Sequence, residues 1–208
     1  MFDDEAKYEC FDGYTSGGRA GGEVTFQVKC QDSGVLTDPK VCEPVKCGRA
    51  PSVPKSRPSI AGDAFFGQNL VYTCDVGYSL TGTPAGGIEF QRHCKKDGGF
   101  SAMASEQPCK PMSGGNAPTI SNAAMTEYAG RPVTSFPPSV FYPDGLEYRC
   151  NQGYSSTGLT SGSTKITSRV NSIGQFSRRT RGLAVSNCSS NLWPTPPHPI
   201  PAFSEMII

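Results

Sequence analysis

Tyr72-Thr73-Cys74-Asp75-Val76-Gly77-Tyr78 decides how this chain of 208 residues is organised, because its pattern occurs three times. Residues 8–14 and residues 148–154 repeat it as Tyr-x-Cys-x-x-Gly-Tyr, and a segment rich in Ser, Thr and Gly follows each copy. No other feature of the sequence recurs with this specificity. The fold and the function must therefore be inferred from an array of similar units.

A second position recurs 20 residues after each of these cysteines. Cys30 and Cys94 occupy it in the first two copies, and Val170 occupies it in the third. The second copy also contains Cys47 and Cys109, so that it has four cysteines.

The composition favours short strands joined by turns. The chain has 24 Gly, 18 Pro and one Trp, and it lacks long helix-forming runs. Nine cysteines at regular spacing favour disulfides over a metal site, because there is no Cys-x-x-Cys pair and His93 and His198 lie far apart. We expect no cofactor, and disulfides would place the protein in an oxidising compartment.

The four cysteines of the second copy, its Tyr-x-Cys-x-x-Gly-Tyr and the later Gly99-Phe100-Ser101 resemble the complement control protein module, also called sushi. Cys42-Glu43-Pro44-Val45-Lys46-Cys47-Gly48 has the form in which this family joins its modules. The resemblance covers residues 1–188 and implies an all-β fold, built of tandem, disulfide-stapled, β-sandwich-like modules in an elongated array. The expected divisions are module one at 1–43, module two at 44–110, module three at 111–188 and a proline-rich disordered tail at 189–208.

Four cysteines allow three connectivities, and the sequence alone does not choose among them. The family joins the first cysteine to the third and the second to the fourth. Carried over, the resemblance implies Cys10–Cys42, Cys47–Cys94, Cys74–Cys109 and Cys150–Cys188.

The first copy is expected to be incomplete at its N-terminal side. Phe2 precedes Cys10 by eight residues, as Phe66 precedes Cys74, so the counterpart of residues 47–65 is missing and Cys30 is predicted to be a free thiol. The start of the chain is acidic and is not a signal peptide. We therefore expect an N-terminally truncated fragment of a longer secreted or cell-surface protein, with no membrane span in this part.

The third copy differs in its cysteines and in its length. Alignment without gaps places Gly114 at the position of Cys47 and Val170 at that of Cys94, so both partners of one family disulfide are absent together. An extra segment at 130–138 contains prolines, which predicts a surface loop and not an added strand.

Catalytic chemistry is not indicated. No Ser-His-Asp or Cys-His spacing stands out, and the Gly-rich residues 16–22 have no following helix that could bind phosphate. The near-neutral total charge disfavours nucleic acid as a partner. Residues 114–188 nevertheless carry a net charge of +4. Five cations near the end of this copy form a candidate patch for sulfated glycans or an acidic partner: Lys165, Arg169, Arg178, Arg179 and Arg181.

Asn187-Cys188-Ser189 is a candidate site of N-glycosylation. For the whole chain, the resemblance implies extracellular or cell-surface modules that bind protein or glycan partners without catalysis, as in complement regulation, adhesion or receptor recognition. Two alternatives stay open: a structural spacer in an extracellular coat or stalk, and accessory modules of a secreted protease.

Overall fold

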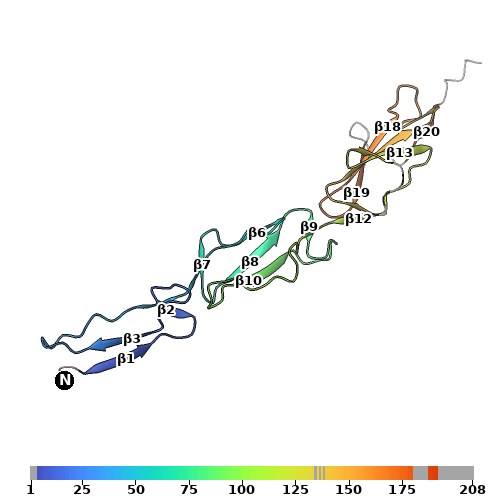
Figure 1. Cartoon of the computed structure of the whole chain (residues 1–208). Helices are drawn as coiled ribbons and strands as arrows, with labels where there is room; N and C mark the ends of the chain where they lie inside the picture. Colours follow the sequence, from blue (N-terminus) through green and yellow to red (C-terminus); the bar gives the residue numbers. More distant parts are fainter. Residues whose placement is uncertain (1–3, 134, 136, 138, 180–186, 192–208) are drawn as a thin grey trace, which may run out of the picture. The chain divides into compact units, whose positions relative to one another are not determined.

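The structure is a computed structural model that describes residues 4–133, 135, 137, 139–179 and 187–191 (Figure 1). Within these ranges every regular element is a β-strand, and all strand pairings are antiparallel. The chain divides into two compact units, Met1–Pro111 and Met112–Ile208. The predicted all-β class with disulfide-bonded modules is confirmed.

The first copy of the repeat consists of two small pairs of strands. Its strands are β1 (Glu5–Glu9), β2 (Tyr14–Ser16), β3 (Thr25–Lys29) and β4 (Cys42–Pro44). β1 pairs with β3, and β2 pairs with β4. The ring of Tyr8 on β1 stacks on Phe26 of β3, with 5.4 Å between the ring centroids.

The second copy adds strands on the N-terminal side of the same pattern. Its strands are β5 (Lys46–Arg49), β6 (Ser56–Pro58), β7 (Asp63–Phe65), β8 (Asn69–Cys74), β9 (Tyr78–Ser79), β10 (Glu89–His93) and β11 (Lys110–Pro111). β8 lies between β10 and β6, whereas β5 pairs with β7 and β9 with β11. The core on this sheet contains Val53, Ala64, Leu70, Tyr72 and Cys94.

The first and second copies are in contact within their unit. The backbone N–H of Val45 donates to the carbonyl of Gly13 at 2.9 Å, and the N–H of Phe66 donates to the carbonyl of Val45 at 2.7 Å. The ring of Phe66 meets that of Tyr14 edge to face. A Cβ atom on Gly13 would lie 2.1 Å from the Phe66 ring, so this contact requires glycine at position 13.

The third copy forms the largest sheet. Its strands are β12 (Ser113–Gly115), β13 (Ala123–Tyr128), β14 (Arg131–Pro132), β15 (Val140–Phe141), β16 (Gly145–Cys150), β17 (Tyr154–Ser155), β18 (Lys165–Val170), β19 (Phe176–Arg179) and β20 (Ser189–Ser190). One sheet has the order β14-β13-β16-β18-β19, while β12 pairs with β15 and β17 with β20. Alternate residues of β16 and β18 are buried, as expected for strands with one face in a core.

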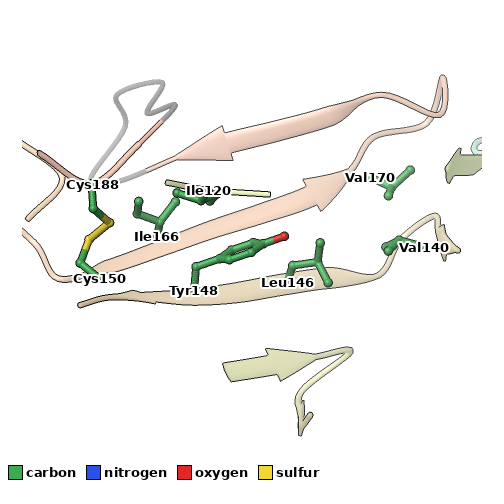
Figure 2. Packing of buried hydrophobic residues seen from close by; sticks show 8 residues of the cluster. All are labelled: Ile120, Val140, Leu146, Tyr148, Cys150, Ile166, Val170 and Cys188. Atoms are coloured by element: carbon green, nitrogen blue, oxygen red, sulfur yellow. A yellow bond between two sulfur atoms is a disulfide. The ribbon is translucent and has the colours of Figure 1, made fainter. Parts of the chain in front are cut away.

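The core of this unit runs along β16 and β18. Tyr148 and Ile166 lie in its middle, with the disulfide Cys150–Cys188 at one end and Val170 at the other (Figure 2). A unit this small buries too little apolar surface to be stable on its core alone, so covalent links matter for its stability.

Two expectations about the third copy are wrong. The segment 130–138 was expected to be a loop without a strand, but Arg131–Pro132 forms β14 at the edge of the sheet, where a proline without an N–H is tolerated. The disordered tail was expected to begin at residue 189, but Ser189–Ser190 forms β20 against β17. Residues 192–208 of the expected tail lie outside the described residues.

A tight turn links the cysteine to the next strand in all three copies. Gly13, Gly77 and Gly153 have φ values of 80°, 85° and 82°, which L-residues with a side chain rarely adopt. In each copy the N–H of the tyrosine after this glycine donates to the carbonyl three residues earlier. The Gly-Tyr of the motif is therefore a requirement of the backbone.

Candidate functional site

The first tyrosine of the motif is a buried structural residue in the second and third copies. Tyr72 and Tyr148 are 0% and 1% exposed. Their hydroxyls donate to the carbonyls of Pro51 at 2.9 Å and Pro118 at 2.6 Å. Burial raises the pKa of Tyr72, and the positive charge and hydrogen bonding of Arg92 oppose that rise. These tyrosines are buried hydrogen-bond donors inside the fold and are not placed to react with a ligand.

A hydroxyl that directly follows Gly-Tyr has the same role in every copy. Thr15, Ser79 and Ser155 are buried, and each side chain donates to the carbonyl four residues later, at 2.9, 2.9 and 2.8 Å. The bond closes the loop after Gly-Tyr and satisfies a buried polar group. Ser or Thr follows Gly-Tyr in every copy, so the sequence contains a signal for this buried hydroxyl that the predictions above do not include.

The structure has four disulfides, and they join the same cysteine pairs that the resemblance implied. They are Cys10–Cys42, Cys47–Cys94, Cys74–Cys109 and Cys150–Cys188. Cys30 is a free, partly buried cysteine. The backbone of Cys30 forms an isolated β-bridge with Leu36, as the backbone of Cys94 does with Phe100. Cys30 therefore lies at the position that the third cysteine has in the second copy.

Gly114 and Val170 lie side by side where the second copy has the disulfide Cys47–Cys94. Val170 is 2% exposed, and a Cβ atom on Gly114 would lie 2.7 Å from its Cγ2 and 3.2 Å from the ring of Phe176. Val170 pairs with Phe176 in the register that Cys94 has with Phe100. The valine side chain therefore fills space that a disulfide occupies in the neighbouring copy, and the glycine leaves room for it.

The candidate basic patch is only partly described. Lys165 and Arg169 lie on the exposed side of β18, and Lys165 forms an ion pair with Glu147. β18 pairs with β19, so that Arg178 stands opposite Ser168 and Arg179 opposite Thr167 in the backbone register. Arg181 lies outside the described residues.

A hollow of about 350 Å³ lies beside this strand in the third copy. Glu127, Asp144 and Glu147 line it, and they are the only acidic residues in the segment 114–188. Arg169 and the turn residue Ala129 also line it. Asp144 accepts a hydrogen bond from the hydroxyl of Tyr128 at 2.8 Å, and burial together with this bond raises the pKa of Tyr128.

Asn187, the candidate glycosylation residue, is exposed at the end of the third copy. Its Oδ1 accepts a hydrogen bond from the N–H of Ser121 at 3.4 Å. The following residue, Cys188, is 2% exposed and belongs to the disulfide at the end of the core (Figure 2).

The described residues form no arrangement that indicates catalysis or metal binding. His93 lies on β10, where its backbone N–H donates to the hydroxyl of Ser101, and His198 lies outside the described residues. In the part of the chain that the structure describes, no group of three or more His, Cys, Asp or Glu side chains could hold a metal ion. The described residues also include no helix with the length and apolar character of a membrane span. The Gly-rich residues 16–22 comprise the last residue of β2 and most of its connection to β3.

Comparison with known proteins identifies the repeat. Residues 47–109 match the family model of the sushi repeat, or SCR repeat. The "Complement control protein homolog" of Saimiriine herpesvirus 2 (strain 11) is 29% identical over 141 residues, which are 67% of this chain and 35% of that protein. The "Sushi, von Willebrand factor type A, EGF and pentraxin domain-containing protein 1" of Rattus norvegicus is 31% identical over 112 residues, which are 53% of this chain and 3% of that protein.

This chain thus spans about a third of the viral relative and a small part of the rat relative. The matched repeat coincides with the second copy. Its disulfide Cys74–Cys109 has a counterpart in each of the other copies, and its buried Tyr72 has one in Tyr148 of the third copy. The match of residues 47–109 to the sushi repeat, together with these relatives, supports a family of sushi, or complement control protein, modules for this chain.

Proposed function

We propose that the chain is a segment of an extracellular or cell-surface protein and that its modules bind a protein partner without catalysis. Sushi modules are generally non-enzymatic binding modules of proteins outside the cell, which supports this assignment. Fold alone does not determine a function, so the binding surface has to be argued from particular side chains.

The observation that carries the proposal is a contrast between shared interior and differing surface. All three copies have a buried hydroxyl, which Thr15, Ser79 and Ser155 provide. In each copy the cysteine of the Tyr-x-Cys motif also forms a disulfide with a later cysteine. These groups maintain the fold. The hollow lined by Glu127 and Arg169 instead includes the turn that precedes β14, a strand described only in the third copy. A surface that changes while the scaffold is kept is suited to recognition.

The charges at this hollow favour a protein over a uniformly charged polymer. All three carboxylates of an otherwise basic segment lie there together with Arg169. A ligand carrying only negative charge would meet the carboxylates at short range, whereas a protein surface can offer both signs in a complementary arrangement. The binding would be weak for one module and would gain from repetition along an array.

A complement component is the first partner to test, because the viral relative is named a complement control protein homolog. The purified chain is added to serum, and deposition of complement protein on an activating surface is measured. We expect the chain to reduce deposition and Arg169→Ala to weaken that effect at least fivefold. Arg57→Ala, which removes an exposed cation from the second copy, is the matched control and should leave the effect unchanged.

Polyanion binding through Lys165, Arg169, Arg178, Arg179 and Arg181 is the second candidate. The pairing of β18 with β19 favours it, because it brings the backbone of Arg178 and Arg179 next to the strand that carries Lys165 and Arg169. Retention on a heparin column that falls when Arg178, Arg179 and Arg181 are changed to Ala would support this candidate. A chain that neither binds heparin nor reduces complement deposition would favour the spacer role instead.

A further inference from the structure

The chain contains a single Asn-x-Ser/Thr sequence with a residue other than proline in the middle, and it is Asn187-Cys188-Ser189. The structure adds that Asn187 is exposed and that its Oδ1 accepts the N–H of Ser121. That bond engages the amide oxygen and leaves the amide nitrogen, Nδ2, as the atom available to carry a sugar. An attached glycan at this exposed position would be compatible with the folded unit.

The residues after Asn187 are held in the fold much more firmly. The N–H of Cys188 donates to the carbonyl of Ser121 at 3.0 Å, and its carbonyl accepts from Nδ2 of Asn122 at 3.1 Å. Ser189 begins β20, opposite Ser155 of β17. Cys188 is buried in the disulfide with Cys150. The acceptor side chain is thus accessible, but the backbone that follows it is fixed by a covalent bond and by hydrogen bonds.

A transferase that modifies this sequence must reach both the amide of Asn187 and the hydroxyl of Ser189. It therefore requires the chain around Cys188 to be free of its partners. We propose that Asn187 is N-glycosylated during entry into the secretory pathway, and that closing of the Cys150–Cys188 disulfide competes with this modification. The proposal rests on the extracellular location proposed above.

Transfer of the glycan and closure of the disulfide are the two competing steps. In the transfer, a bond forms between Nδ2 of Asn187 and the anomeric carbon of an oligosaccharide. The bond from that carbon to a polyisoprenyl pyrophosphate breaks, the pyrophosphate leaves, and Nδ2 loses one proton. In disulfide closure, the thiols of Cys150 and Cys188 lose two electrons and two protons to a disulfide-bearing oxidant of the compartment. Whichever step occurs first at residues 187–189 sets the fraction of glycosylated chain.

The test uses the full chain behind a cleavable secretory leader, translated in the presence of endoplasmic-reticulum membranes. The readout is a mass increase that a peptide N-glycosidase removes. We expect partial modification of the wild type and none of Asn187→Gln. Ser189→Thr keeps a hydroxyl at the acceptor's third position and should be modified at least as well as the wild type.

Cys150→Ser tests the competition, because it removes the disulfide without changing residues 187–189. We expect it to raise the modified fraction at least twofold. Cys74→Ser is the matched control, since it opens the disulfide to Cys109 in the other unit, and it should leave the fraction unchanged.

Two results would overturn the proposal. Absence of the mass increase in the wild type, Ser189→Thr and Cys150→Ser alike would exclude the glycosylation site. Equal modification of the wild type and Cys150→Ser, or an equal increase in Cys74→Ser, would exclude local competition. A chain that enters the membranes unmodified and still binds its partner would contradict only this inference and not the proposed function.

Discussion

The second and third copies fill the same position in their folds by different means. In the second copy Cys47 and Cys94 are bonded across this position, whereas in the third Gly114 faces the buried side chain of Val170. Both solutions leave Phe100 or Phe176 paired next to the same site. The difference shows that the geometry of the position is kept when the covalent bond is absent, because apolar packing fills the volume.

The two solutions stabilise the fold through different physical effects. A disulfide that closes a long loop restricts the unfolded chain, which typically contributes about 2–4 kcal/mol, and packing of one valine contributes about 1.5–3 kcal/mol. The third copy has a larger sheet, which joins β14 and β19 to β13, β16 and β18. Changes at the shared position should reveal how far this sheet compensates.

The largest effect is expected from opening the disulfide of the second copy. Changing Cys47 and Cys94 together to Ser should lower the free energy of unfolding of unit Met1–Pro111 by about 2–5 kcal/mol, because the loop is released and two polar groups enter a core. Amide hydrogen exchange in β8 and β10 measures this locally, which is necessary in a chain of several units.

Replacing Cys47 by Gly and Cys94 by Val would install the third copy's solution in the second. We expect a smaller loss than with two serines, since the valine restores apolar volume without a buried hydroxyl. If the Gly/Val variant is no more stable than the Ser/Ser variant, the comparison between the copies does not hold.

The reverse exchange is expected to have the next largest effect. Gly114→Cys combined with Val170→Cys should form a disulfide, because the two positions are already in contact, and should stabilise the third copy by about 2–4 kcal/mol. Mass spectrometry under oxidising conditions measures thiol loss, and hydrogen exchange in β16 and β18 measures stability. Gly114→Ala is the control, because a methyl group without a bond crowds Val170 and should cost about 1–3 kcal/mol. Persistence of both free thiols in the double variant would contradict the prediction.

The tyrosine hydroxyls should have a smaller effect that is similar in both copies. Tyr72→Phe and Tyr148→Phe each remove a hydrogen bond to a proline carbonyl and should cost about 0.5–1.5 kcal/mol. Tyr8→Phe is the matched control, because Tyr8 holds the same place in the motif but is 49% exposed, and it should change little. Urea titration followed by hydrogen exchange provides the values. A cost at Tyr8 equal to that at Tyr72 would contradict the structural role.

The smallest expected effect is a dependence of stability on pH at the turn that contains Asp97, which the equivalent turn of the third copy should lack. A hydrogen bond from Lys95 and another from the N–H of Gly99 hold the pKa of Asp97 below its ordinary value. The corresponding turn of the third copy is instead held by Asn171, whose Oδ1 accepts from Ile173 and Gln175 and does not titrate.

The sign of the pH effect follows from the lowered pKa of Asp97. Its stabilising contribution is present above the ordinary carboxyl pKa and is lost as the pH falls through the lower folded pKa. NMR titration of the Asp97 carboxyl should give a midpoint below that of unfolded Asp, and Lys95→Ala should raise it. An unchanged midpoint in Lys95→Ala would contradict this cause.

Much of the scaffold could be predicted from the sequence because its determinants are local or covalent. Positive φ at Gly77 and its equivalents is encoded within one turn, and the alignment already places Gly114 and Val170 at positions of lost cysteines. The shared hydroxyl at Thr15, Ser79 and Ser155 was missed, although its signal was present, because its partner is a backbone carbonyl that a sequence does not show.

The candidate binding surface was less predictable. The predicted basic patch groups residues that are close along the chain. The structure brings Glu127, Asp144 and Glu147 to the hollow beside Arg169, and it pairs Lys165 with Glu147. Lys165 and Arg169 lie on β18, whereas these acidic residues lie on β13, on β16 or next to β16. Charge neighbours across strands depend on register and cannot be read from spacing along one strand.

The sequence by itself determined the repeat, the positions of the cysteines and the turns at Gly-Tyr, since each depends on residue identity at a fixed separation. Only the tertiary structure decided that Val170 fills the volume beside Gly114 and that the third copy's acids share one hollow. It also decided that Asn187 is exposed while Cys188 is buried beside it. The reason is physical: packing and charge contacts join residues far apart in the chain, and they exist only after the strands have paired.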